Sequence, residues 1–137
     1  MNKKNYLVLS LTLFLFSSLL YSQSSRNVKP TISIRYDDII NGMTPSSAIG
    51  IIFDADEDKY TGFETNADGD EIRLIMGWKW SMIGLGTKDI DENTTVTLIS
   101  LGGKYSVFDN MYTTIEYIRV DHPTVNDFIR LSLGVNF

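Results

Sequence analysis

Residues 127–137, DFIRLSLGVNF, alternate between large apolar side chains and polar or small ones. The apolar positions are Ile129, Leu131, Leu133, Val135 and Phe137, and the positions between them are Arg130, Ser132, Gly134 and Asn136. Successive side chains of a β-strand point to opposite sides, so this pattern predicts a strand with one apolar and one polar face. An aromatic residue at the end of the apolar face is typical of a strand that ends at a membrane–water interface.

The same alternation recurs along the chain from residue 31 onward. The alternating segments are separated by Asn, Asp, Gly and Pro, which favour turns. The clearest internal segment places Ile72, Leu74, Met76, Trp78 and Trp80 on one face, with a tight turn expected at residues 81–82. We expect eight strands, at about residues 31–40, 47–54, 60–65, 72–80, 83–87, 94–107, 111–120 and 127–137. The polar run at residues 88–93 is expected to form a loop, and no sustained 3.6-residue period follows the N-terminal segment, so the sequence predicts an all-β domain.

The N-terminal segment has the order of a secretory signal peptide. Lys3 and Lys4 precede an apolar run from Tyr6 to Tyr21, and small polar residues follow at positions 22–25. The alternative is a retained membrane anchor, but the run is shorter than the ~20 residues that a spanning helix needs. We expect a cleaved signal peptide at residues 1–24, a short leader at 25–30 and a β-barrel domain at 31–137.

Composition excludes several classes of protein. The chain has no cysteine, so no disulfide can stabilise a small exported domain. Its formal net charge of −5 and the lack of basic patches exclude nucleic acid as an expected partner. Any membrane insertion after the signal peptide would have to use strands, because no second apolar run reaches the length of a spanning helix.

The charged residues of the expected strands lie on the face opposite the large apolar side chains. This arrangement is compatible with both a soluble sandwich and a membrane barrel, so it does not distinguish between them. Acids and bases stand in mid-strand among glycines and serines, which favours a closed interior where the charges can pair. We therefore predict an antiparallel, up-and-down, eight-stranded closed transmembrane β-barrel, with these charges in its lumen: Arg35, Glu64, Arg73, Lys79, Lys104, Glu116 and Arg130.

Aromatic residues gather near the ends of the even-numbered strands. In an up-and-down barrel these positions form one rim, and Trp and Tyr favour the membrane interface because part of the ring stays in lipid while its polar edge stays wet. Aromatic cross-strand packing in a soluble core is the alternative. The predicted rim consists of Phe53, Trp78, Trp80, Tyr105, Phe108 and Phe137.

The chain from Thr31 to Phe137 resembles the small eight-stranded outer-membrane barrels of Gram-negative bacteria, which include the membrane domain of outer membrane protein A and the outer membrane protein X type. The resemblance rests on Ile129 and on four residues that look like the signal read by the outer-membrane assembly machinery, namely Leu131, Leu133, Val135 and Phe137. It implies a monomer in the outer membrane that contacts membrane lipid and outer-leaflet lipopolysaccharide. The expected outer loops are shorter than those of the family, which argues against a receptor or adhesin role.

An acidic run and a lone histidine are the candidates for chemistry. Residues 54–58 carry alternating carboxylates, as a calcium loop would, but Lys59 replaces the glycine that such loops need and Thr65 stands in place of the bidentate glutamate. A hydrolase could use His122 with Ser132, yet nothing in their spacing requires the pairing. We expect no metal site, no cofactor and no catalytic residues.

The sequence thus predicts a non-enzymatic outer-membrane barrel with a structural role in membrane integrity, whose lumen is filled by polar side chains and has no open pore. The alternative is a soluble periplasmic or secreted β-barrel that binds a small apolar ligand.

Overall fold

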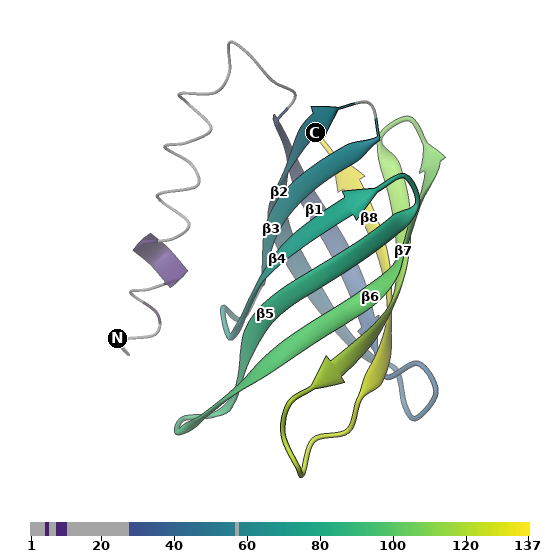
Figure 1. Ribbon diagram of the computed structural model, residues 1–137. Coiled ribbons are helices and arrows are strands. Elements are labelled where there is room, and N and C mark those ends of the chain that lie inside the picture. Colours follow the sequence, from purple (N-terminus) through teal and green to yellow (C-terminus); the bar gives the residue numbers. More distant parts are fainter. Residues whose placement is uncertain (1–4, 6–7, 11–27, 57) are drawn as a thin grey trace.

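The structure is a computed structural model that describes residues 5, 8–10, 28–56 and 58–137 (Figure 1). Most of the predicted signal peptide and the first part of the predicted leader lie outside the described residues. No helix in the described part of the chain is long and apolar enough to cross a membrane.

Eight strands form a closed antiparallel barrel in which each strand pairs with its neighbours in sequence and β1 pairs with β8 (Figure 1). The all-β fold, the strand number and the antiparallel closure predicted from the alternation are therefore confirmed. The strands are β1 (Val28–Asp37), β2 (Thr44–Asp56), β3 (Lys59–Asn66), β4 (Glu71–Trp78), β5 (Ser81–Asp91), β6 (Thr94–Phe108), β7 (Met111–Val120) and β8 (Phe128–Asn136).

The barrel has two different ends. β1 begins and β8 ends at the same end, where Thr31 pairs with Asn136, and we call this the terminal end. The other strands are joined there by the short connection between Asp56 and Lys59 and by turns at residues 79–80 and 109–110. The opposite end, which we call the loop end, carries the connections at residues 38–43, 67–70, 92–93 and 121–127.

Several strand boundaries differ from the prediction because backbone geometry, which alternation does not report, sets the turns. β1 begins at Val28 rather than Thr31 and ends at Asp37. Asp38 has a φ of 55°, and its carbonyl accepts hydrogen bonds from the N–H groups of Asn41, Gly42 and Met43, which closes the loop early.

The turn after β4 also lies earlier than predicted. β4 ends at Trp78, and Lys79 and Trp80 form the turn in place of residues 81–82. Lys79 has a φ of 57°, and the Ser81 hydroxyl donates a 2.7 Å hydrogen bond to the Trp78 carbonyl, which fixes the reversal at this point.

The expected loop at residues 88–93 is wrong for most of its length. β5 continues to Asp91, and only residues 92–93 connect it to β6. Lys88 pairs with Val96 and Asp89 pairs with Thr95, so cross-strand pairing extends the strand through residues whose polarity suggested a loop.

Two tyrosines point into the barrel beside glycines on the neighbouring strand. Tyr60 pairs with Gly77 and Tyr112 pairs with Gly134. A Cβ atom would lie 2.0 Å from the Tyr60 ring at Gly77 and 2.2 Å from the Tyr112 ring at Gly134. Each ring therefore lies where a side chain of the neighbouring strand would otherwise stand, and each needs the glycine opposite it.

Candidate functional site in the charged lumen

The most buried part of the lumen is a chain of ion pairs. Arg73 donates two hydrogen bonds to the Glu116 carboxylate, of 2.6 and 2.8 Å, and its Nε donates a third to Glu64 at 2.5 Å. The Ser100 hydroxyl also donates to Glu116, at 3.1 Å. A bidentate arginine–carboxylate pair of this kind fixes both partners in orientation as well as distance.

The chain continues through two more arginines. Arg35 donates to Glu64 at 2.9 Å and to Glu71 at 2.6 Å. Arg130 donates to Glu71 at 2.9 Å and to Asp37 at 2.6 Å. The result is one unbroken series of alternating sign, which we call the lumen ion chain: Asp37, Arg130, Glu71, Arg35, Glu64, Arg73 and Glu116.

Burial of these charges is extreme. The largest fully buried side chains of the described residues are Arg35, Arg130, Ile118, Glu71 and Glu116, and only one of them is apolar. Isolated ions cannot be buried at acceptable cost, so each needs opposite charge and hydrogen bonds around it. The alternation of sign supplies both.

An apolar cluster fills another part of the lumen at the loop end. Val96, Leu98, Ile118 and Val120 are buried together, and Val125 and Phe128 pack against them. Charge pairs and apolar side chains thus occupy different parts of the lumen.

Six of the seven charges assigned to the lumen from the sequence point into it, and five of these six belong to the ion chain. The sixth, Lys104, is half-buried toward the terminal end and lines the enclosed cavity together with Glu64 and Arg73, but forms no ion pair with the chain. Lys79 is a correction: it lies exposed in the β4–β5 turn, with its ammonium 5.1 Å from the Trp78 ring centroid, because the strand ends one residue before it.

Sequence reasoning missed two members of the ion chain, Asp37 and Glu71. Asp37 fell inside the expected strand at residues 31–40 and Glu71 directly before the one at residues 72–80, but neither was assigned to the lumen. Parity could have found them, since Asp37 shares its face with Arg35 and Glu71 shares its face with Arg73.

The aromatic residues assigned to a rim lie on the terminal half of the barrel. Most are exposed, whereas Phe53 is half-buried. On β8, Leu133 is exposed and Leu131 and Val135 are half-buried on the same face, and Phe137, directly after the strand, is also exposed.

The candidates for chemistry are not brought together. His122 lies in the β7–β8 loop, where its Nδ1 accepts a hydrogen bond from the Thr124 backbone, while Ser132 is buried in the lumen. Among the described residues, no group of three or more His, Cys, Asp or Glu is arranged to hold a metal ion. Glu57, within the acidic run at 54–58, lies outside the described residues.

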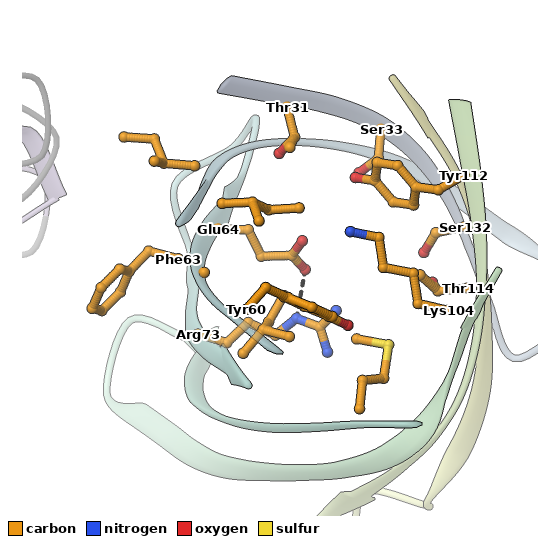
Figure 2. Close-up of a pocket in the computed structure, with 15 residues that line it drawn as sticks. Thr31, Ser33, Tyr60, Phe63, Glu64, Arg73, Lys104, Tyr112, Thr114 and Ser132 are labelled. Atoms are coloured by element: carbon orange, nitrogen blue, oxygen red, sulfur yellow. Dashed lines mark hydrogen bonds and ion pairs between the residues drawn. The ribbon is translucent and has the colours of Figure 1, made fainter. Parts of the chain in front are cut away.

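The enclosed space in the lumen is small. Figure 2 shows the side chains around it, with Glu64 and Arg73 joined by a hydrogen bond. The cavity holds about 20 Å³ and is lined in part by Thr31, Ser33, Thr114 and Ser132. A volume of this size accommodates about one water molecule.

Comparison with known proteins finds similarity to solved structures alone. No family model matches the chain, and no curated protein matches it. The solution NMR structure of the de novo designed TMB2.3 is 14% identical over 84% of this chain and 98% of its own, with a TM-score of 0.53. A structure titled "De novo design of transmembrane beta-barrels" is also 14% identical, over 80% and 94%, with a TM-score of 0.46.

The first of these comparisons supports the class of fold, a closed eight-stranded antiparallel β-barrel, as the structure itself displays.

Replacing Glu116 by Gln should lower the free energy of unfolding by about 3–5 kcal/mol, because it leaves the buried Arg73 guanidinium without its main counter-ion. Urea titration of the refolded barrel measures the loss. Glu92→Gln, in the exposed β5–β6 turn, should change stability by less than about 0.5 kcal/mol. Equal small effects of both substitutions would contradict a stabilising role for the ion chain.

Asp127 in the β7–β8 loop provides a pH-dependent test. Its pKa lies below the usual 3.8 because the Tyr117 hydroxyl and the Val120 N–H donate hydrogen bonds to its carboxylate, at 2.7 and 2.9 Å. The ionised carboxylate therefore stabilises the fold fully above the unfolded pKa, and this contribution is lost as pH falls through the lower folded pKa.

Asp127→Asn should consequently lower the Tm at neutral pH, and the difference from the unmodified chain should shrink as the solution is acidified below about pH 4. Asp121→Asn controls for loss of a negative charge from the same loop. A Tm difference that stays constant with pH would rule out stabilisation through the ionised Asp127.

Proposed function

We propose that this chain is an exported, non-enzymatic β-barrel of the Gram-negative outer membrane, with a structural role in membrane integrity. The observation that carries the proposal is the inverted polarity of the barrel. Four of the five largest fully buried side chains of the described residues are charged, while large apolar side chains are exposed on its outside.

The outer surface supports contact with lipid. Ile34, Ile49, Leu85, Leu101 and Leu133 come from five different strands and are each about half exposed or more. Met76 on β4 and Ile115 on β7 extend the same surface. Soluble monomers rarely expose apolar surface that is continuous around the molecule, whereas a bilayer requires it.

Closure of the sheet also supports a lipid environment for the barrel. Each strand pairs on both sides, so no edge leaves its N–H and C=O groups without partners. In hydrocarbon each unsatisfied group would cost several kcal/mol, and closed barrels avoid that cost.

Aromatic side chains support a membrane interface at the terminal end. Trp78, Trp80, Tyr105, Phe108 and Phe137 are exposed there. The terminal end also carries only short turns, and bacterial barrels place short turns in the periplasm. In our proposal, the terminal end faces the periplasm and the loop end faces outward, where its acidic loops lie near lipopolysaccharide.

The packed lumen supports a structural role rather than transport or storage. An eight-stranded barrel has an interior that side chains can fill, and the ion chain and the apolar cluster occupy this one. A soluble barrel that binds an apolar ligand would need a large apolar cavity, while the enclosed space here is only about 20 Å³, and its lining mixes charged and hydroxyl side chains with apolar ones such as Ile51 and Met82.

The proposed partners follow from location. They are membrane lipid, outer-leaflet lipopolysaccharide and the assembly machinery, which would read Leu131, Leu133, Val135 and Phe137 at the end of β8. The barrel would act as a monomer without a cofactor.

Location is tested by expressing the full chain in a Gram-negative host and fractionating the cells. The chain should be found in the outer membrane and should migrate faster on a detergent gel before boiling than after it, because a closed barrel stays folded in detergent. Recovery as a folded monomer in plain buffer would contradict the proposal.

Lipid contact is tested by Leu101→Arg. Leu101 lies in the middle of β6 and is 66% exposed on the outer face. In phospholipid vesicles the substitution should cost about 2–4 kcal/mol of folding free energy at mid-membrane depth. Urea titrations followed by gel mobility measure the cost.

Thr97→Arg is the matched control, because Thr97 is exposed on the same face of the same strand but lies closer to the loop end. Near the interface its cost should fall to about 0–1 kcal/mol. In a water-soluble barrel both substitutions would change stability by about 0.5 kcal/mol or less, and that result would refute membrane insertion.

A further inference from the structure

A second cavity opens at the terminal end of the barrel. Its volume is about 290 Å³, far larger than that of the enclosed cavity in the lumen. Lys104, Tyr60, Tyr112, Asn136 and Ile52 form its buried or half-buried floor. Its exposed rim includes Asp58, Lys59, Lys79 and Asp109.

Lys104 stands apart from the other lumen cations. Its ammonium lies 4.5 Å from the Tyr60 ring centroid and 4.4 Å from the Tyr112 ring centroid. Among the described residues, no carboxylate lies within ion-pair distance of it, whereas Arg35, Arg73 and Arg130 each bind at least two.

Two aromatic faces stabilise a cation but do not neutralise it. Glu64, which lines the enclosed cavity together with Lys104, is already held by Arg35 and Arg73. Figure 2 shows Lys104 extending from the wall beside Tyr112 toward the middle of the lumen, with Glu64 and Arg73 on the facing wall. Within the described part of the chain, this half-buried ammonium forms no ion pair with an anion.

A neutral donor lies in the same floor. The Tyr60 hydroxyl is buried and has no hydrogen-bond partner in the described structure. Buried hydroxyls are normally satisfied, so an unpaired one indicates a missing hydrogen-bond partner. Tyr60 and Lys104 both line the terminal cavity, and both can donate a hydrogen bond to an acceptor placed between them.

Among the side chains that the structure describes, no acid around the cavity forms an ion pair with Lys104. Asp54 and Lys29 both line the cavity and form an ion pair with each other at 3.2 Å. Asp58 and Asp109 are exposed at the rim, as are Lys59 and Lys79. The rim is therefore mixed in charge, while the floor carries an unpaired cation.

We propose that the terminal cavity is a binding site for a small organic anion, in which a carboxylate accepts hydrogen bonds from Lys104 and Tyr60. The body of the ligand lies against Ile52, Met111 and the Tyr112 ring, which supply the apolar lining of the cavity. The site contains no member of the lumen ion chain, although Tyr60, Lys104 and Tyr112 also line the enclosed cavity beside Glu64 and Arg73. It does not depend on the surroundings of the barrel.

Benzoate is the probe, and benzamide is its neutral counterpart of similar size and shape. Isothermal titration is performed on the folded full chain in a nonionic detergent, with gel mobility confirming that the barrel is closed. Benzoate should bind about tenfold or more tightly than benzamide, because only benzoate brings the charge that Lys104 lacks.

Lys104→Met keeps most of the side-chain volume and removes the charge, and it should weaken benzoate binding by about tenfold or more. Tyr60→Phe should weaken it by about two- to tenfold. Lys88→Met is the matched control, because Lys88 is also half-buried but lies toward the loop end, and it should leave benzoate affinity unchanged.

Equal affinity for benzoate and benzamide, undetectable binding of benzoate at millimolar concentration, or full affinity in Lys104→Met would each overturn the site. If Lys104→Met does not fold, the two ligands on the unmodified chain and the Tyr60→Phe variant decide the question. Should fractionation show a soluble protein, the same titration in plain buffer still tests the site, so its outcome is distinguishable from failure of the membrane proposal.

Discussion

Pairing between β1 and β8 creates the interior on which the rest of the structure depends. Thr31 meets Asn136 and Asp37 meets Arg130 along this seam, so the first and last strands complete the ring of backbone hydrogen bonds. The seam also brings together Asp37 and Arg130, which form one end of the lumen ion chain. Without closure these charges would face solvent or lipid rather than one another.

Closure also explains why the two faces of the sheet differ so strongly. Every strand contributes to one wall, so alternate residues point either into a narrow interior or away from it. Charges can be buried in the interior only because each is paired with opposite charge, as Arg35 is with Glu64 and Glu71. The exterior has no comparable partners, and its apolar side chains match a hydrocarbon environment.

Alternation in the sequence was sufficient to predict the number of strands and the face on which most residues lie. A period of two determines to which side of the sheet each side chain points. It was insufficient at turns, where positive φ angles at Asp38 and Lys79 set the ends of β1 and β4. The polar stretch at 88–91 looked like a loop because its pairing with β6 is a long-range property. For the same reason the sequence could assign Arg73 and Glu116 to the lumen but could not show that they meet, or that Lys104 lies between two tyrosines.

The alternating order of the ion chain has a consequence for how this protein can diverge. Arg35 serves two glutamates and Glu71 serves two arginines, so a change of sign at either position disturbs neighbours on several strands at once. Single charge changes are therefore expected to destabilise the barrel, and inverting one pair in the middle of the chain would place like charges beside its outer neighbours. Related chains should vary freely among apolar residues on the outside while their internal charges change together.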